Sequence, residues 1–187
     1  MIEKPLCLSG GAEGADLQWG MTAGAAGHQV IHWGFSGHKS KAPKEEIVLL
    51  SKEQLLVADE YLKSASVILK RYYPAKSEYV CNLLRRNYYQ IAWSESFYGV
   101  AKIDSTGLVE GGTGWAWAMF SQLHPNKDCW LFCQKENKWF QFKDQIWIQK
   151  DPNIPTNIWT GVGSRELTQE GKQAIRALMN WSNKNPS

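Results

Sequence analysis

No apolar run in this sequence approaches the roughly 18 consecutive residues that a membrane-spanning helix needs. No dense block of Lys and Arg appears either, and a net charge of +3 does not by itself indicate binding to nucleic acid. The first residues, MIEKPLCLSGG, pass from a short apolar run into a glycine turn and do not resemble a signal peptide. We therefore expect a cytoplasmic protein with neither a membrane nor a nucleic acid as its partner.

Cysteine and histidine are scarce, at four residues each. Cys129 and Cys133 lie on a predicted strand, where residues four apart are separated by about 13 Å, too far for a disulfide or a shared metal ion. The same spacing separates His28 and His32. The sequence therefore predicts reduced structural thiols, no metal site and no required cofactor, and it leaves catalytic residues unassigned.

The 187 residues, 43% of them apolar, are enough for a single domain with a full hydrophobic core. Strand-like and helix-like segments alternate along the chain. Strands are predicted at 5–8, 28–31, 98–103, 128–133 and 157–160, and helices at 15–25, 44–62, 77–94, from the GGTG turn to 122, and at 169–181. Such alternation is typical of an α/β domain with a mostly parallel sheet. Alternating apolar residues at 136–150 predict an inserted β-hairpin.

Three glycine-bearing segments, SGGAEGAD at 9–16, EGGTGWA at 110–116 and GVGSRE at 161–166, each follow a strand-like run and open a helix-like one. Glycine lets the backbone come close to an anion, and the free N–H groups of the new helix point at it. Because the carboxyl ends of parallel strands meet at one edge of a sheet, three such loops predict a single anion-binding site.

The candidate ligand contacts come mainly from these loops. They are Ser9, Gly10, Gly11, Gly14, Asp16, Asp104, Gly111, Gly112, Thr113, Gly114, Gly161, Gly163, Ser164 and Arg165. Gly11 is expected to face the anion, where a side chain would take the anion's space, and Arg165 to pair with a phosphate in bidentate fashion. Asp16 either interacts with the dipole of its own helix or accepts a hydrogen bond from a ribose hydroxyl. Ordinary turn geometry is the alternative interpretation of each glycine.

Ten tryptophans are the unusual feature of the composition. Most are expected to pack the core or to cover sheet edges. Trp33, Phe35 and Trp115 lie near the glycine loops and are the candidates for stacking on a base, because the face of an indole can cover a purine ring.

The segments SGGAEGAD, LRRNYYQIA, EGGTGWAWAM and TGVGSRELTQEG together resemble the Rossmann-like SLOG superfamily, in particular its YpsA-like and phage-encoded members. The resemblance covers nearly the whole chain except the hairpin. In that family the GVGSRE-type unit comes first, whereas here it comes last, at 154–187. The chain therefore resembles a circular permutant, and we expect a three-layer Rossmann-like fold in which the strands at 5–8 and 157–160 are parallel neighbours. The resemblance also implies an even-numbered homo-oligomer, with the aromatic hairpin as its contact or as an edge cover.

The resemblance implies further site residues, because Arg86 and Asn87 match the family's Arg-Asn pair, while Arg85 is expected at the surface. The LOG branch of the family cleaves N-glycosidic bonds with a glutamate in the helix after its glycines, and that position here is Ala118. Whether the chain is an enzyme stays open on these grounds. The leading hypothesis is a protein that binds a nucleotide-derived signal, ADP-ribose-like or a cyclic nucleotide, as a phage or prophage product that sequesters an immune signal. A nucleotide hydrolase with an acid relocated to Glu13 or Glu110 is the alternative, and DNA binding as in the DprA branch is the second.

Overall fold

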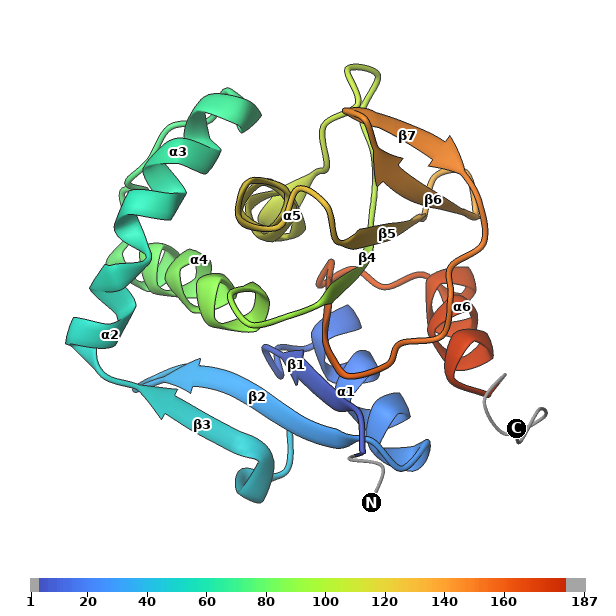
Figure 1. Cartoon of the computed structure of the whole chain (residues 1–187). Helices are drawn as coiled ribbons and strands as arrows, with labels where there is room; N and C mark the ends of the chain where they lie inside the picture. Colours follow the sequence, from blue (N-terminus) through green and yellow to red (C-terminus); the bar gives the residue numbers. More distant parts are fainter. Residues whose placement is uncertain (1–3, 181–187) are drawn as a thin grey trace.

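A computed structural model describes residues 4–180 of the chain (Figure 1). Within those residues, eight strands form one sheet in the order β3-β2-β1-β8-β4-β5-β6-β7. The strands are β1 (Leu6–Ser9), β2 (Gln29–Phe35), β3 (Ile47–Leu50), β4 (Ser96–Ala101), β5 (Asp128–Cys133), β6 (Lys138–Lys143), β7 (Ile146–Gln149) and β8 (Ile158–Gly163). The strands from β3 to β5 in this order run parallel, whereas β6 pairs with β5, and β7 with β6, in the antiparallel sense.

Helices cover both faces of the sheet. They are α1 (Ala15–Ala25), α2 (Lys52–Val57), α3 (Asp59–Leu69), α4 (Glu78–Ile91), α5 (Gly111–Leu123) and α6 (Gln169–Asn180), with a 3₁₀ turn at Lys44–Glu46. One core cluster joins α1 and α6 to the sheet, and a second joins α4 and α5 to the opposite face, with α3 packed across those two helices (Figure 1). Strand β5 contributes to both clusters, because Trp130 packs in the cluster with α1 and α6 and Leu131 packs in the cluster with α4 and α5. The predicted Rossmann-like three-layer α/β fold, with its added hairpin, is confirmed.

Strand β8 lies between β1 and β4 and pairs in parallel with each, so the predicted adjacency of the N-terminal and C-terminal strands is confirmed. Helix α1 sits directly on β8. A Cβ at Gly161 would lie 2.5 Å from Trp19 Cγ, and the Trp19 indole donates a hydrogen bond to the Val162 carbonyl at 3.2 Å. The absence of a side chain at Gly161 thus lets Trp19 of α1 reach the middle of the sheet.

The predicted helix at 44–62 is wrong in its first part. Residues 44–46 form a 3₁₀ turn, and Ile47–Leu50 form the edge strand β3, which pairs in parallel with β2. Helix α2 begins only after Ser51, which forms a capping box with Gln54. The apolar run IVLL fits a helical period as well as an extended one, and pairing with β2 decides between them. The end of the last predicted helix, at 181, lies outside the described residues.

The four cysteines are buried and free, as expected for structural thiols, and burial raises the pKa of Cys7 and of Cys129. The predicted hairpin is β6–β7, which extends the sheet beyond β5. Its aromatic side chains face inward: Trp147 donates to the Gly107 carbonyl at 3.0 Å, and Trp139 lies 6.5 Å from Trp19, ring centre to ring centre. None of the helices in residues 4–180 is long and apolar enough to cross a membrane.

His32 on β2 is only 1% exposed, and neither of its ring nitrogens has a hydrogen-bond partner within the described residues. The nearest carboxylate oxygen, on Glu46, is 3.6 Å away, beyond hydrogen-bond distance. Burial, together with the nearby positive charge of Arg86, lowers the pKa of His32 to about 4. The imidazole is therefore neutral at pH 7.

His32 is expected to make the fold sensitive to acid. Its pKa is near 6.5 in the unfolded chain and about 4 in the folded protein, so between these values the unfolded state binds more protons and stability falls as pH falls. The loss should reach on the order of 3 kcal/mol. The variant His32→Gln should lose that part of the dependence, measured by urea unfolding at pH 7, 5.5 and 4.5. An unchanged slope in the variant would contradict this assignment.

Candidate functional site

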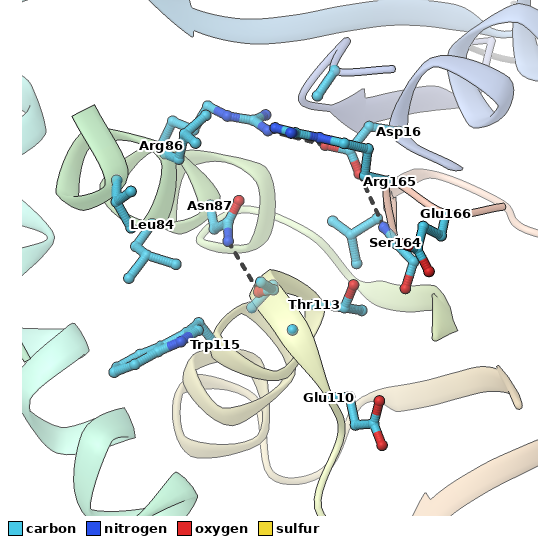
Figure 2. A pocket seen from close by; sticks show the side chains of 18 of the residues that line it. Asp16, Leu84, Arg86, Asn87, Glu110, Thr113, Trp115, Ser164, Arg165 and Glu166 are labelled. Atoms are coloured by element: carbon cyan, nitrogen blue, oxygen red, sulfur yellow. Dashed lines mark hydrogen bonds and ion pairs between the residues drawn. The ribbon is translucent and has the colours of Figure 1, made fainter. Parts of the chain in front are cut away.

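A cavity of about 670 Å³ opens at the carboxyl ends of the central parallel strands. Its walls come from the loops after β1, β8, β4 and β5, from α4 and from the link between α3 and α4 (Figure 2). Strands β2 and β3 lie to one side of it in the sheet, and β4 and β5 lie to the other. It is thus the crevice at the topological switch point, where parallel α/β sheets commonly hold ligands.

The structure brings ten of the predicted site residues to this cavity. They are Asp16, Arg86, Asn87, Gly111, Gly112, Thr113, Trp115, Gly163, Ser164 and Arg165. They come from all three glycine segments and from α4, so the loops converge as predicted. Figure 2 shows Asp16 and Arg86 on one side of the cavity and Thr113, on α5, on the other.

The remaining predicted residues are not part of the cavity lining. They are Ser9, Gly10, Gly11, Gly14, Asp104, Gly114, Gly161, Trp33 and Phe35. Most of them lie close behind the lining, where they let neighbouring segments approach one another.

In the first glycine segment, at 9–16, polar groups that could face an anion are hydrogen-bonded to other parts of the protein. The Ser9 hydroxyl is buried and faces the carbonyl oxygens of Asp16 and Gly161, at 2.9 and 2.6 Å. The first N–H of α1, at Ala15, donates to the Ser164 carbonyl at 3.0 Å. Gly14 has a φ of 104°, and a Cβ there would lie 2.4 Å from the carbonyl oxygen of Arg165. The N-terminus of α1 is therefore occupied by the loop after β8 and is not open to an anion.

Asp16 and Arg86 form a buried ion pair between α1 and α4, with side chains 8% and 6% exposed and a 3.2 Å distance from Arg86 Nη2 to Asp16 Oδ2. The second carboxylate oxygen of Asp16 accepts from the Gly163 N–H at 2.9 Å. Burial raises the pKa of Asp16, and the charge of Arg86 opposes that rise. The carboxylate thus joins α4 to β8, a role that neither of the two sequence interpretations included.

Gly10 makes room for this pair. A Cβ at Gly10 would lie 1.4 Å from Arg86 Nη1, so no side chain fits there. With its amide oxygen turned toward the donors, Gln90 accepts from Arg86 Nη1 at 2.7 Å and from the Gly10 N–H at 3.2 Å. The interpretation of Gly10 as an anion contact is therefore replaced by a packing role.

Gly11 faces away from the cavity. Its φ is 61°, and a Cβ there would lie 2.4 Å from Ser40 Oγ and 3.2 Å from the Cβ atoms of Ala42 and His32. Ser40 in turn donates to the Gly11 carbonyl at 2.9 Å. A side chain at Gly11 would displace the 38–42 loop and would not fill an anion's space, which corrects the role expected from the sequence.

Three other predicted contacts serve the fold elsewhere. Trp33 packs on Tyr89, with ring centres 5.4 Å apart, and Phe35 is buried in the same cluster between β2 and α4. Asp104 accepts hydrogen bonds from the Thr106 and Leu108 N–H groups of its own loop, at 2.8 and 3.0 Å. Of the three residues proposed for base stacking, only Trp115 lines the cavity.

The N-terminus of α5 is the open part of the site. A Cβ at Gly111 or Gly112 would meet no other atom within 4 Å, and no side chain caps the helix. The first N–H groups of a helix have no intrahelical partner. Thr113 is 3% exposed and lines the cavity, and its hydroxyl has no partner within residues 4–180. An anion placed here would meet backbone donors, a hydroxyl and the positive end of a helix dipole.

The sequence did not identify Arg71 as a site residue, and it predicted Arg85 at the surface. Arg71, in the α3–α4 link, donates to the carbonyl oxygens of Val109 and Gly111, each at 2.9 Å, and also lines the cavity. Arg85 was expected at the surface but is buried, and it pairs with Asp59 at 2.6 Å and with Glu78. This pairing lowers the pKa of Asp59. No glycine, repeat or spacing pattern marks either arginine in the sequence.

Comparisons with protein-family models, with curated proteins and with solved structures give no match for this chain. In residues 4–180, no group of three or more His, Cys, Asp or Glu side chains is placed to hold a metal ion. What the cavity binds is therefore inferred from its own donors, acceptors and shape.

The Asp16–Arg86 pair is expected to hold the site together. The variant Asp16→Ala leaves a buried guanidinium without its partner and should lower the free energy of unfolding by about 3–5 kcal/mol. Asp16→Asn keeps an acceptor for the Gly163 N–H and should cost less. Urea unfolding checks both, with the exposed Glu136→Ala as the matched control. An Asp16→Ala protein as stable as that control would contradict a structural role for the pair.

Proposed function

We propose that this protein binds a nucleotide-derived small molecule, ADP-ribose-like or a cyclic nucleotide, in the cavity at the carboxyl edge of the sheet. The observation that carries the proposal is the N-terminus of α5. It opens into about 670 Å³ of space with uncapped N–H groups and with the buried, unpartnered hydroxyl of Thr113. Phosphate oxygens are the acceptors that such a set of donors suits best. The volume is within the range of small-molecule sites.

The cavity lining carries as many acidic as basic side chains, and the support for an anionic ligand comes from the basic side chains that are not paired with an acid. Arg86 is neutralised by Asp16, and Glu13 is paired with Lys41 at 2.9 Å. Arg165 is exposed and has no hydrogen bond or ion pair within the described residues, so its guanidinium is available to a phosphate (Figure 2). Arg71 stands beside the first turn of α5. Arg71 and Arg165 both line the cavity and are the cationic partners proposed for the ligand.

We further propose that the domain is a circularly permuted member of the SLOG superfamily. Two features of the structure are consistent with that. Strand β8 lies next to β1 in the sheet, and α6 packs beside α1 on the same face, so the β8–α6 unit would precede β1 if the ends were joined (Figure 1). On this proposal the chain is a phage or prophage product that sequesters a nucleotide immune signal.

Nucleotide hydrolysis is the second candidate, because Glu13 and Glu110, the two acids named from the sequence, line the cavity together with Glu166. Cleavage of an N-glycosidic bond needs a carboxylate near the sugar to stabilise the positive charge that develops there. Ala118, at the position of the LOG-branch glutamate, is fully buried in the core and supplies none. Chromatography of the ligand after incubation and release separates the two functions. An intact ligand means a binder, and a free base means an enzyme.

Loss of a phosphate contact should weaken binding without unfolding the protein. Arg165→Ala is expected to cost on the order of 1.5–3 kcal/mol of binding free energy, and Thr113→Val about 1 kcal/mol, the scales of a charged and a neutral hydrogen bond. Calorimetry against ADP-ribose, AMP and cyclic dinucleotides measures both. The exposed Arg176→Ala on α6 is the matched control. If both cavity variants bind as tightly as the control, the anion site lies elsewhere.

Self-association is proposed through the free edge of the hairpin. Strand β7 ends the sheet and leaves Ile146 and Ile148 exposed. We expect an even-numbered oligomer by light scattering at tens of micromolar, and a monomer for Ile148→Lys, since a charge on the edge opposes the contact. A monomeric parent protein would contradict the proposal.

A further inference from the structure

The cavity has one apolar end. Its lining there consists of Tyr72 and Ala75 from the α3–α4 link, Val80, Leu83 and Leu84 from α4, and Trp115 from α5. Leu84 and Trp115 are buried and form the floor, while Tyr72 and Val80 are exposed at the rim. Figure 2 shows Leu84 and Trp115 at the opposite end of the cavity from Ser164, Arg165 and Glu166. One ligand spanning the cavity would therefore have an apolar part and a charged part.

The backbone that carries Tyr72 is fixed on both sides. Lys70 has a φ of 53°, and the N–H groups of Lys70 and Arg71 donate to the carbonyls of Val67 and Ser66, the Schellman pattern that ends α3. Arg71 is then tied to the start of α5 by its two bonds to backbone carbonyls.

The other side of the link is tied to α3 and α4. The Tyr73 hydroxyl donates to Asp59 Oδ1 at 2.6 Å, and Asp59 also accepts from Arg85. The Ala75 carbonyl faces the Cys81 thiol at 3.4 Å. Hydrogen bonds therefore hold the residues on both sides of Tyr72, Arg71 and Tyr73, in place. The Tyr72 side chain lines the cavity from this hydrogen-bonded segment.

The Tyr72 ring itself has no partner in the part of the chain that the structure describes. Its side chain is 82% exposed, the highest value among the large apolar and aromatic side chains of residues 4–180. Within the same residues it has no hydrogen bond and no contact with another ring. A tyrosine exposed at a cavity rim above a buried Leu and Trp floor is suited to stack on a flat aromatic group.

From this arrangement we infer that Tyr72 and the apolar floor form a base-binding subsite, with the base stacked on the Tyr72 ring and the phosphate at the N-terminus of α5. The inference rests on the proposed function and adds to it. It assigns stacking of the base to Tyr72 in the α3–α4 link, not to Trp33 or Phe35, and it keeps Trp115, the third candidate from the sequence, as part of the floor. A wholly apolar ligand is disfavoured, because it would leave the donors at the other end of the same cavity unmatched.

Calorimetry with ADP-ribose, AMP and ribose 5-phosphate, which lacks a base, tests the subsite. The parent protein should bind the two adenine compounds more tightly than ribose 5-phosphate. Tyr72→Ala should weaken binding of the adenine compounds about tenfold, the order of one lost stacking contact, and leave ribose 5-phosphate unchanged. Tyr72→Phe keeps the ring and should bind as the parent does. Tyr79→Ala, on α4 but outside the cavity lining, is the matched control.

The outcomes separate the subsite from the proposed function. A parent protein that binds none of the three compounds overturns both. If ribose 5-phosphate and AMP bind equally tightly, or if Tyr72→Ala binds AMP as the parent does, the anion site stands and the base subsite is overturned. An equal loss of affinity for all three compounds in Tyr72→Ala assigns the residue to positioning of the link, and that result also overturns stacking. Melting temperatures of the variants check that each remains folded.

Discussion

The buried pair of Arg86 and Asp16 is the interaction around which the cavity is built. It joins α4 to α1 across the carboxyl edge of the sheet, and the same carboxylate holds the backbone of β8 through the Gly163 N–H. Gly10 has no side chain because the guanidinium takes that space, and Gln90 supplies a further acceptor. Removing two charges from water is costly, and the hydrogen bonds of Arg86 to Asp16 and Gln90 and of the Gly163 N–H to Asp16 offset part of that cost, while Arg86 Nε has no partner within the described residues. Its geometry holds α1, α4 and β8 together on this side of the cavity.

The glycines divide into two groups with different physical roles. Gly10, Gly14 and Gly161 allow close approach between segments, since a Cβ at each would overlap a side chain or a carbonyl. Gly111 and Gly112 instead border open space at the start of α5. Of these five glycines, only Gly111 and Gly112 have the geometry in which a small residue leaves room for a ligand. A motif can therefore bring a loop to a site without every glycine of the motif touching what binds there.

Much of the architecture could be predicted from the sequence, because apolar periodicity and turn residues are local signals. The limits of α1 and β5 agree with prediction, as does the pairing of β1 with β8. The strand β3 was missed because four apolar residues carry no period that separates strand from helix. The convergence of the three loops followed from sheet topology. The roles of Arg71, Arg85 and Tyr72 could not be predicted from the sequence, because each depends on contacts with segments that are distant in the sequence.

The place of β8 in the chain has a consequence for how the protein is made. This strand is central in the sheet but is the last of its eight strands in the chain, and the hydrogen bond between the Ser9 hydroxyl and the Gly161 carbonyl joins residues 152 positions apart. Until β8 is synthesised, β1 and β4 have no strand between them, and the sheet exists only as two separate halves. Contacts that close such long loops slow folding. All eight strands must therefore be synthesised before the sheet, and the cavity at its edge, can be completed.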